Sequence, residues 1–356
     1  MCIDFLLGAA EDGAIVSGRD LEFGHPLLSG GIVRGKNSKL HSYAPGFKRG
    51  LEWQTKYSYV GIDAFGGLLS SIPALQSLVT CIDGLNSEGL SCGSLWLPGA
   101  TKYYETTPTD ADKSLIVVQF TEWVLGMCKE VADVRHALES GVVKVWGNGF
   151  LQQQMPLHFP IHDRAGKSIV VEFTGSQDKP FNIYEDPVGV CTNFPEFPWH
   201  LTNISNFLGV ESVNPPAMDF GGYKVEPPGQ GLGTELVPGG HSPASRFIRA
   251  LMFKHYASRP KNAAEARNLA VELLNTIYVI KGTAVSAHES DYTQVSSIRD
   301  ATNLIYLVRT GDNQLIRGVD LKDVKIADGE SRTFSLGLKE QFINITEAAR
   351  NGKVIS

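Results

Sequence analysis

The alternation of hydrophobic and polar residues predicts β-strands over much of the chain. Residues 3–22 predict a hairpin, because two apolar runs flank an Asp-Gly pair at 12–13, which is a strong turn signal. This hairpin would fold residues 19–22 back beside Cys2. Further strands are predicted at 57–63, 89–97, 157–163, 168–174, 182–191, 292–298 and 303–309, and a turn at 83–89.

A helical period replaces this alternation in three segments. Apolar residues at helical spacing predict a helix over 114–138, and Ser242 followed by proline predicts a helix N-terminus, with another helix at roughly 261–278. Residues 205–241 are rich in Gly and Pro and predict a long irregular excursion. Strands and helices do not alternate one for one, which disfavours a doubly wound parallel sheet. We therefore expect an α+β fold of two antiparallel sheets with helices outside.

Composition excludes several function classes. The chain has 356 residues, 42% of them hydrophobic, enough for a sizeable core in one large domain or two smaller ones. With 32 basic against 38 acidic residues and no basic stretch, we expect no nucleic-acid partner. No apolar run approaches ~18 residues, so we expect no membrane span. The N-terminus lacks a basic signal region, which predicts a cytoplasmic protein, or a periplasmic one whose leader was replaced by the start Met.

The cysteines and histidines predict neither a disulfide framework nor a metal site. There are five cysteines, odd in number and without a CxxC pair, and nine histidines without HExxH spacing. Cys81, Cys92 and Cys128 lie in apolar surroundings, and we expect them in the core.

Cys2 stands directly behind the initiator Met. Methionine is normally removed when the next side chain is small, and Cys2 would then carry both a thiol nucleophile and an α-amine that is partly neutral at pH 7. A cysteine near a terminus is more often core filler, so position alone does not make Cys2 catalytic.

Charged residues of the second hairpin strand could assist such a thiol. Arg19 could stabilise a thiolate through its fixed positive charge, and Asp20 or Glu22 could hold the α-amine. Strict alternation puts Asp20 and Glu22 on one face and Arg19 on the other, so both roles beside Cys2 require a bulge or a strand end. The alternative for Arg19 and Glu22 is an exposed charge pair.

Three later features have an ordinary and a functional interpretation. Asn193 is a candidate oxyanion donor or a turn residue beside proline. Arg246, early in the helix that Ser242 begins, is a candidate active-site cation or a solvated helix residue. The glycines at 229, 231 and 233 resemble a phosphate loop only in composition, because no Gly-Lys-Ser/Thr follows them.

Several motifs along the chain carry a family resemblance. They are Met1-Cys2, Gly18–Glu22, Asp83–Leu90, Thr192-Asn193 with Pro195, Trp199-His200, Gly229–Gly231, Ser242–Arg249 and Tyr292–Gln294. Taken together, the chain resembles the choloylglycine hydrolase family, which contains bile salt hydrolases and penicillin V acylases.

The resemblance implies a fold and an assembly. It implies an N-terminal nucleophile hydrolase fold, a four-layer αββα sandwich, in a single domain over residues 1–356. The excursion at 194–228 would grip a neighbouring subunit of a homotetramer. The implied reaction is hydrolysis of a linear amide in a small molecule, without a cofactor.

The resemblance also implies roles for individual residues. Cys2 would be the nucleophile and its own amine the base, with Arg19 against the sulfur. Glu22 falls where the family has Asp, and Asp20 could share its task. The implied oxyanion donors are the side chain of Asn193 and the backbone N–H of Trp96. The implied active-site arginine is Arg246.

Two aromatic residues bear on the substrate. Trp96 stands where similar bile salt hydrolases have Asn, and an indole cannot replace an amide. With Phe23 it resembles the penicillin V acylase side of the family and predicts an aryl or fatty acyl group. The alternatives are a bile salt hydrolase, an acyl-homoserine-lactone acylase, or a catalytically silent binding protein that retains Met1. The segment 62–81 is longer than in similar bile salt hydrolases, which leaves the pocket shape open.

Overall fold

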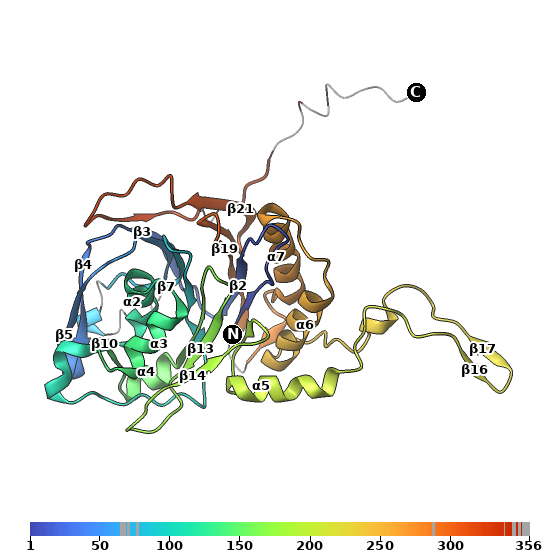
Figure 1. The fold of residues 1–356 in the computed structure, drawn as a ribbon, viewed down its shortest axis with the longest axis horizontal. Coiled ribbons are helices and arrows are strands. Elements are labelled where there is room, and N and C mark those ends of the chain that lie inside the picture. Colours follow the sequence, from blue (N-terminus) through green and yellow to red (C-terminus); the bar gives the residue numbers. More distant parts are fainter. Residues whose placement is uncertain are drawn as a thin grey trace.

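The structure is a computed structural model that describes residues 1–64, 69, 72–75, 78–286, 289–337, 339–343, 347 and 350. Within these residues, two large antiparallel sheets carry helices on their outer sides (Figure 1). The predicted α+β class with an αββα arrangement is therefore confirmed. One cluster of buried hydrophobic side chains runs through the described chain from Cys2 to Leu336.

The first sheet contains both strands of the predicted hairpin. In order across the sheet its strands are β15 (Val190–Cys191), β1 (Cys2–Leu6), β2 (Val16–Phe23), β19 (Ser290–Asp300), β20 (Ile305–Thr310) and β21 (Asn313–Asp320), with β18 (Ala284–Val285) also paired to β19. Helices α6 (Pro243–Tyr256) and α7 (Ala263–Ile277) pack on this sheet. Ser242 accepts a hydrogen bond from the backbone N–H of Ser245 at 3.2 Å, which confirms the predicted helix start.

The second sheet faces the first. Its strands in order are β14 (Asn182–Glu185), β13 (Ser168–Glu172), β12 (Leu157–His162), β8 (Ser91–Gly93), β7 (Cys81–Asn86), β6 (Tyr59–Ala64), β3 (Leu28–Arg34) and β22 (Ser331–Phe334), with β9 (Leu95–Trp96) paired to β12. The helices on this side of the molecule are α2 (Phe120–Met127), α3 (Val131–Glu139) and α4 (Gly149–Gln154), and α2 packs on β7 and β8. Among the described residues, no helix is both long and apolar enough to span a membrane.

Smaller elements complete the described chain. They are the antiparallel pair β4 (Lys39–Ala44) and β5 (Lys48–Gln54), the parallel pair β10 (Ser114–Ile116) and β11 (Lys144–Trp146), α5 (Phe197–Asn203), the hairpin β16 (Met218–Phe220) and β17 (Tyr223–Val225), and 3-10 turns at Pro45–Phe47, Pro73–Leu75, Pro108–Lys113, Val117–Gln119, Ile204–Phe207 and Leu232–Thr234.

The β1–β2 hairpin has the predicted form. Gly13 adopts φ +83° at the turn, which suits glycine, and the register sets Cys2 opposite Leu21. At Gly18 the backbone approaches Phe5 so closely that a Cβ would lie 2.6 Å from the tip of its ring. Every residue of β1 is buried between the helices and the second sheet, so the start of this strand is held firmly inside the molecule.

The helix predicted over 114–138 is wrong in its extent. Residues 114–116 form β10, α2 ends at Met127, and α3 begins at Val131. The break has a local cause, since Glu130 and Asp133 form a reciprocal capping box that begins a new helix. Cys128 is buried beside this break, as expected for a core cysteine.

Three strand boundaries also differ from the predictions. The turn expected at 83–89 is shorter, because β7 continues to Asn86, whose side chain accepts the N–H groups of Glu88 and Leu90 and so fixes the turn itself. The single strands expected at 89–97 and 182–191 each divide into two. Cys81 and Cys92 are fully buried, as expected.

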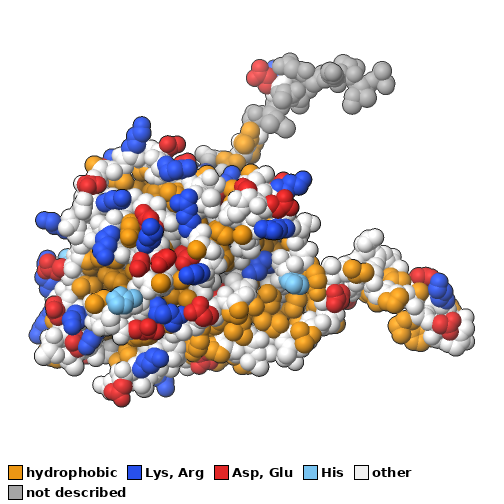
Figure 2. All heavy atoms as spheres, viewed as in Figure 1, with side chains coloured by type: hydrophobic (Ala, Val, Ile, Leu, Met, Phe, Trp, Pro, Cys, Tyr) orange, Lys and Arg blue, Asp and Glu red, His pale blue; other side chains and the backbone are white. Residues whose placement is uncertain are grey.

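Residues 208–241 form an arm that projects from the body of the molecule (Figure 1). Its tip is the β16–β17 hairpin, where Phe220 is 61% and Tyr223 74% exposed, and hydrophobic side chains are visible along it in Figure 2. At its base the N–H groups of Gly231 and Leu232 donate to Asn214, so these glycine-loop amides are already used within the arm. The excursion expected at 194–228 is thus packed at its start, in α5, and projects only afterwards.

Candidate active site

Cys2 lies at the start of β1 with 6% of its surface exposed, and the guanidinium of Arg19 lies beside it. Arg19 Nη2 is 3.8 Å from Cys2 Sγ. The same guanidinium donates to the backbone carbonyls of Ile82, at 2.7 Å from Nη1, and of Ser94. Two carbonyls of the second sheet therefore fix the cation against the sulfur of the first sheet.

The charge of Arg19 is stable in this buried position. Burial opposes the charged form, but Cys2 and Asp83 outweigh it and hold the pKa of Arg19 above its ordinary value. A fixed positive charge at this distance favours the thiolate form of a cysteine.

Behind Arg19, a network of buried charges joins the two sheets. Asp83 of β7 lies 3.4 Å from Arg19 Nη1 and accepts from Arg299 Nη1 at 3.0 Å. Arg299 Nη2 donates to both oxygens of Asp4 at 2.8 Å, and His162 Nε2 lies 2.8 Å from Asp4 Oδ1. Burial raises the pKa of Asp4, yet Arg299 and His162 outweigh it and hold the pKa below its ordinary value. Asp4 therefore stays ionised in the core.

The side chain of Asn193 meets the main chain of Cys2. Asn193 Oδ1 accepts from the backbone N–H of Cys2 at 2.6 Å and from Arg246 Nη2 at 2.9 Å. Asn193 Nδ2 donates to the carbonyl of Trp96 at 2.6 Å. Residues far apart in the chain, 2, 96, 193 and 246, thus converge on one point.

Glu22 and Arg246 form a buried pair beside this point. Both side chains are fully buried, and Arg246 Nη1 lies 3.4 Å from Glu22 Oε2. Thr293 donates to Glu22 Oε1 at 3.1 Å. Burial raises the pKa of Glu22 above its ordinary value, and Arg246 offsets only part of this effect. Arg246 is thus no solvated helix residue, and Glu22 is no exposed charge.

A strand irregularity lies beside the site. The pairing of β19 with β2 shifts between Thr293 and Val295, directly opposite Glu22 and Leu21. The extra residue, Gln294, belongs to β19, whereas β2 pairs with β1 without a shift. Glu22 lies one residue before the end of β2 at Phe23, so a strand end, and no bulge in β2, accompanies it.

Asp20 lies on the face of the sheet away from Cys2. Its cross-strand neighbour in β1 is Ile3, it is fully buried, and neither carboxylate oxygen has a hydrogen-bond partner among the described residues. Burial and the nearby Glu22 raise the pKa of Asp20 well above its ordinary value. Asp20 thus lies behind Glu22 rather than at the thiol.

Met1 pairs with Glu22 as a short extension of β1. Its carbonyl accepts from the N–H of Glu22 at 2.8 Å, and its ammonium donates to the Glu22 carbonyl at 2.7 Å. The ammonium also lies 3.2 Å from Asp291 Oδ2. With Met1 present, the nitrogen of Cys2 is part of a peptide bond and cannot act as a base.

An apolar pocket opens at the sulfur of Cys2. The rings of Phe23 and Trp96 meet edge to face, with centroids 5.2 Å apart. The cavity measures about 20 Å³ and is lined by Cys2, Arg19, Leu21, Glu22, Phe23, Leu27, Ile82, Ser94, Trp96 and Leu157. Part of the lengthened segment 62–81 lies outside the described residues.

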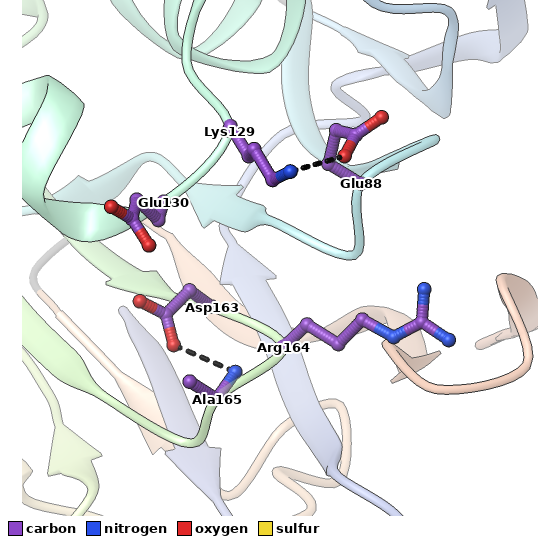
Figure 3. Close-up of a pocket in the computed structure, with 6 residues that line it drawn as sticks. All are labelled: Glu88, Lys129, Glu130, Asp163, Arg164 and Ala165. Carbon is purple, nitrogen blue, oxygen red and sulfur yellow. Dashed lines mark hydrogen bonds and ion pairs between the residues drawn. The ribbon is translucent and has the colours of Figure 1, made fainter.

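A larger surface pocket of about 370 Å³ lies elsewhere and carries charges of both signs (Figure 3). Lys129 and Glu88 pair across it at 3.4 Å, and Asp163 accepts from the N–H groups of Ala165 and Lys167 at 3.0 Å each. Asp163 therefore serves its own turn, and the six lining residues include no cysteine, serine or threonine.

One feature of the sequence could have indicated the buried network between the sheets. Asp4 interrupts an apolar strand that is otherwise hydrophobic, and a buried charge requires a partner. Its partners, Arg299 and His162, lie more than a hundred residues away in the chain, and only the fold brings them to Asp4.

Known proteins resemble this chain over most of its length. The family model described as linear amide C–N hydrolases, choloylglycine hydrolase family, matches residues 5–334. The bile salt hydrolase/transferase of Clostridium perfringens (strain 13 / Type A) is 28% identical over 341 residues, covering 94% of this chain and 96% of that protein. The penicillin V acylase of Pectobacterium atrosepticum is 24% identical, covering 85% of this chain and 77% of that protein.

A solved structure extends the agreement to the fold. A mutant of the conjugated bile acid hydrolase from Clostridium perfringens superimposes with a TM-score of 0.81 at 26% identity, covering 97% of this chain and all of that one. From the match over residues 5–334, the chain belongs to the choloylglycine hydrolase family of linear amide C–N hydrolases.

Proposed function

We propose that Cys2, once Met1 is removed, is the nucleophile that cleaves a linear amide through a thioester intermediate. The observation that carries this proposal is the convergence on Cys2: Arg19 lies at its sulfur, and Asn193 lies at its nitrogen. A thiol, an amine and an amide donor within one buried cluster are the groups that acyl transfer requires.

The mechanism begins at the thiol of Cys2. The Cys2 thiolate, stabilised by Arg19, attacks the amide carbonyl. The resulting oxyanion accepts from the backbone N–H of Trp96 and from the second hydrogen of Asn193 Nδ2, whose first hydrogen is bound to the Trp96 carbonyl. One such donor is worth ~2.7 to 4 kcal/mol in the transition state.

The α-amine of Cys2 handles the protons. It takes the thiol proton and passes it to the leaving nitrogen, so the C–N bond breaks and an amine departs. The same amine then activates a water molecule, which hydrolyses the thioester to a carboxylic acid and restores the thiol. Arg246, paired with Glu22, supports the amine through Asn193, because Asn193 Oδ1 accepts from both Arg246 and the Cys2 nitrogen.

Removal of Met1 is a condition of this proposal. Intact mass should show a chain without Met1 and with turnover, and Cys2→Ala should abolish turnover while leaving the fold unchanged by circular dichroism. Turnover in the Cys2→Ala variant would refute the proposal. A purified chain that keeps Met1 and binds substrate without cleaving it would support the silent binding protein instead.

We infer an aryl or fatty acyl group from the side chains at the opening, because the cavity of about 20 Å³ is itself smaller than either group and has to widen to admit one. Phe23 and Trp96 offer two aromatic faces beside the sulfur, and the described lining is largely apolar. Bile salt conjugates are the second candidate, which the similarity to a bile salt hydrolase over nearly the whole chain favours.

A direct comparison separates these two candidates. The kcat/KM values for penicillin V and glycocholate should be measured on one preparation whose Met1 removal is confirmed by mass. A preference for penicillin V supports recognition by Phe23 and Trp96. A preference for glycocholate would mean that segment 62–81 sets the pocket, and the aryl or fatty acyl assignment would be wrong.

We further propose that residues 1–356 act as one domain and that the arm joins copies of this chain into a homotetramer. The arm carries exposed apolar side chains at its tip, including Phe220 and Tyr223, and an exposed apolar surface of this kind fits a protein partner.

A further inference from the structure

Arg19 of β2 and Asp4 of β1 stand directly opposite each other in the register of the two strands. Side chains at opposite positions of an antiparallel pair share a face, with Cβ atoms about 4.5–5.5 Å apart, which is within reach of an ion pair. The hydrogen bonds of Arg19 nevertheless go to the carbonyls of Ile82 and Ser94, and its Nη2 lies 3.8 Å from Cys2 Sγ. The carboxylate opposite Arg19 therefore does not draw the cation away from the sulfur.

Arg299 of β19 binds that carboxylate instead. Its Nη2 donates to both oxygens of Asp4 at 2.8 Å, and its Nη1 donates to Asp83 Oδ1 at 3.0 Å. The partner of Arg299 in β2 is Ser17, which shares a face of that strand with Arg19. The Arg299 side chain thus crosses β2 to reach β1, and a side chain as small as Ser17 leaves room for it.

Asp83 is also held by groups other than Arg19. Ser297 and Tyr306 donate to Asp83 Oδ2 at 2.7 and 2.6 Å. At Oδ1, Arg299 lies at 3.0 Å and Arg19 at 3.4 Å, so Arg299 makes the shorter contact. Strands β19 and β20 therefore supply Asp83 with three donors, and the guanidinium of Arg19 keeps its shorter bonds to carbonyl groups.

The four buried charges behind the sulfur balance one another. Arg19 and Arg299 are the cations, Asp4 and Asp83 are the anions, and each of the four side chains is buried. Without Arg299, this group would hold one cation and two carboxylates, and little water would screen them. Asp4 would then attract the guanidinium opposite it, and the excess negative charge would oppose a thiolate at Cys2.

We propose that Arg299 is a positioning residue for the thiol, because by holding Asp4 and Asp83 it keeps Arg19 on the sulfur of Cys2. This inference rests on the proposed function, since it gives Arg299 a part in preparing the nucleophile. Other charged or titratable groups face the same region, namely the amine of Cys2, Cys191 of β15, His162 of β12, Glu22 of β2 and Arg246 of α6.

The test measures how fast the Cys2 thiol is alkylated at each pH. The full chain, with removal of Met1 confirmed by mass, reacts with iodoacetamide, and peptide mass identifies Cys2 as the modified residue. For Arg299→Gln we expect the midpoint of the rate profile to rise by about one pH unit, which lowers the rate about tenfold at pH values below the midpoint.

A second substitution should restore the charge balance. Asp4→Asn alone leaves the cations in excess, so its midpoint should lie below that of wild type. Combined with Arg299→Gln, it leaves Arg19 as the one cation and Asp83 as the one carboxylate of the group. The midpoint of this double variant should return to within about 0.3 pH units of wild type.

Arg267→Gln is the matched control. Arg267 of α7 pairs with the buried carboxylate of Asp300, the residue after Arg299 and therefore on the other face of β19. The thermal midpoint should fall in this variant as in Arg299→Gln, because both leave a buried carboxylate without its cation. The alkylation profile of Cys2 should stay within about 0.2 pH units of wild type, which a purely structural role of Arg299 would also predict for Arg299→Gln.

Two results would overturn the inference. One is a folded Arg299→Gln whose midpoint equals that of wild type, and the other is a double variant that keeps the raised midpoint. If Arg299→Gln does not fold, Asp4→Asn decides, and a midpoint at or above that of wild type would overturn the inference. Failure of the proposed function is a different outcome, in which Cys2→Ala still cleaves amides whatever the alkylation profile shows.

Discussion

His200 Nε2 lies 2.9 Å from the backbone carbonyl oxygen of Asn193, the residue whose side chain meets Cys2. The imidazole is buried and stacks on Phe247 with centroids 4.9 Å apart. Burial lowers the pKa of His200, so the ring is neutral at pH 7 and donates through Nε2. A second layer of contacts thus fixes the backbone of Asn193 relative to the thiol.

His200→Phe should lower kcat about tenfold to a hundredfold with little change in KM, because small misplacements of an aligned group have effects of this size. Phenylalanine keeps the stacking on Phe247 and removes only the hydrogen bond. His200→Gln, which restores a donor, should recover most of the rate. A variant with raised KM and unchanged kcat would show that His200 shapes substrate binding instead.

Asn193→Asp separates the two functions of this side chain. The carboxylate keeps the acceptor for Cys2 and Arg246, so the variant should fold, but it loses the donor hydrogens of Nδ2. We expect kcat to fall about 10²- to 10³-fold, the usual effect of losing one oxyanion donor. Single-turnover kinetics with the thermal midpoint as control would measure this, and a rate near wild type would exclude Asn193 as an oxyanion donor.

Asp20→Asn should make the protein more stable at neutral pH. The pKa of Asp20 is raised in the folded state, so the native protein holds a proton that the unfolded chain releases above about pH 4. The free energy of unfolding of the wild-type protein therefore falls as the pH rises from the pKa of Asp20 in the unfolded chain to its raised pKa in the folded protein. The asparagine variant does not titrate there, and its advantage should grow with pH.

Unfolding midpoints of Asp20→Asn and wild type at pH 4 and pH 8 would check this. We expect a small difference at pH 4 and a higher midpoint for the variant at pH 8. A variant that is less stable than wild type at pH 8 would show that the Asp20 carboxylate is ionised and paired.

Activity should depend on Glu22 and not on Asp20. Glu22→Gln leaves the buried Arg246 without its anion and weakens the support of the amine, so we expect kcat/KM to fall by at least about tenfold and stability by about 3 kcal/mol or more. Glu22→Asp, which keeps the charge, should retain most activity. Assays at low temperature with the fold verified would separate the two effects, and an inactive Asp20→Asn beside an active Glu22→Gln would reverse the assignment.

Charges on the arm tip should break the proposed assembly without harming catalysis. Phe220→Asp and Tyr223→Asp together place two charges on exposed rings that touch nothing essential in the body of the molecule. We expect light scattering to show a smaller species while kcat/KM stays within about twofold, since a surface change is usually mild. The same mass for both proteins would mean that the arm tip does not join subunits.

Local features of the fold could be predicted from the sequence, and distant contacts could not. The β1–β2 hairpin follows from alternation and an Asp-Gly turn, and the start of α6 follows from Ser242. The break between α2 and α3 had a local signal in Glu130 and Asp133, which the continuous apolar period concealed. The long apolar period over 114–138 predicts one helix, because it outweighs the short polar capping signal of Glu130 and Asp133.

The site also contains features that the sequence could predict and contacts that it could not. The conflict between the faces of Arg19 and Glu22 predicted a bulge or a strand end, and Glu22 does lie next to the end of β2, while the shift near Thr293 adds its extra residue to β19. The contact of Asp4 with Arg299 joins residues at opposite ends of the chain, and periodicity carries no information at that separation. The roles of Arg246 and Asn193 are implied by the family resemblance. Without it, the simpler interpretation is a solvated helix residue for Arg246 and a turn residue for Asn193.

The buried ion network has a consequence for how this enzyme can change. Arg19 takes its position from Ile82 and Asp83 of β7 and from Ser94 between β8 and β9, whereas Phe23 and Trp96 are half-buried at the ends of β2 and β9. Substitutions at the rim can therefore alter the acyl preference without disturbing the charge at the sulfur. New substrates are accessible to this scaffold through mutations that leave its reactivity untouched.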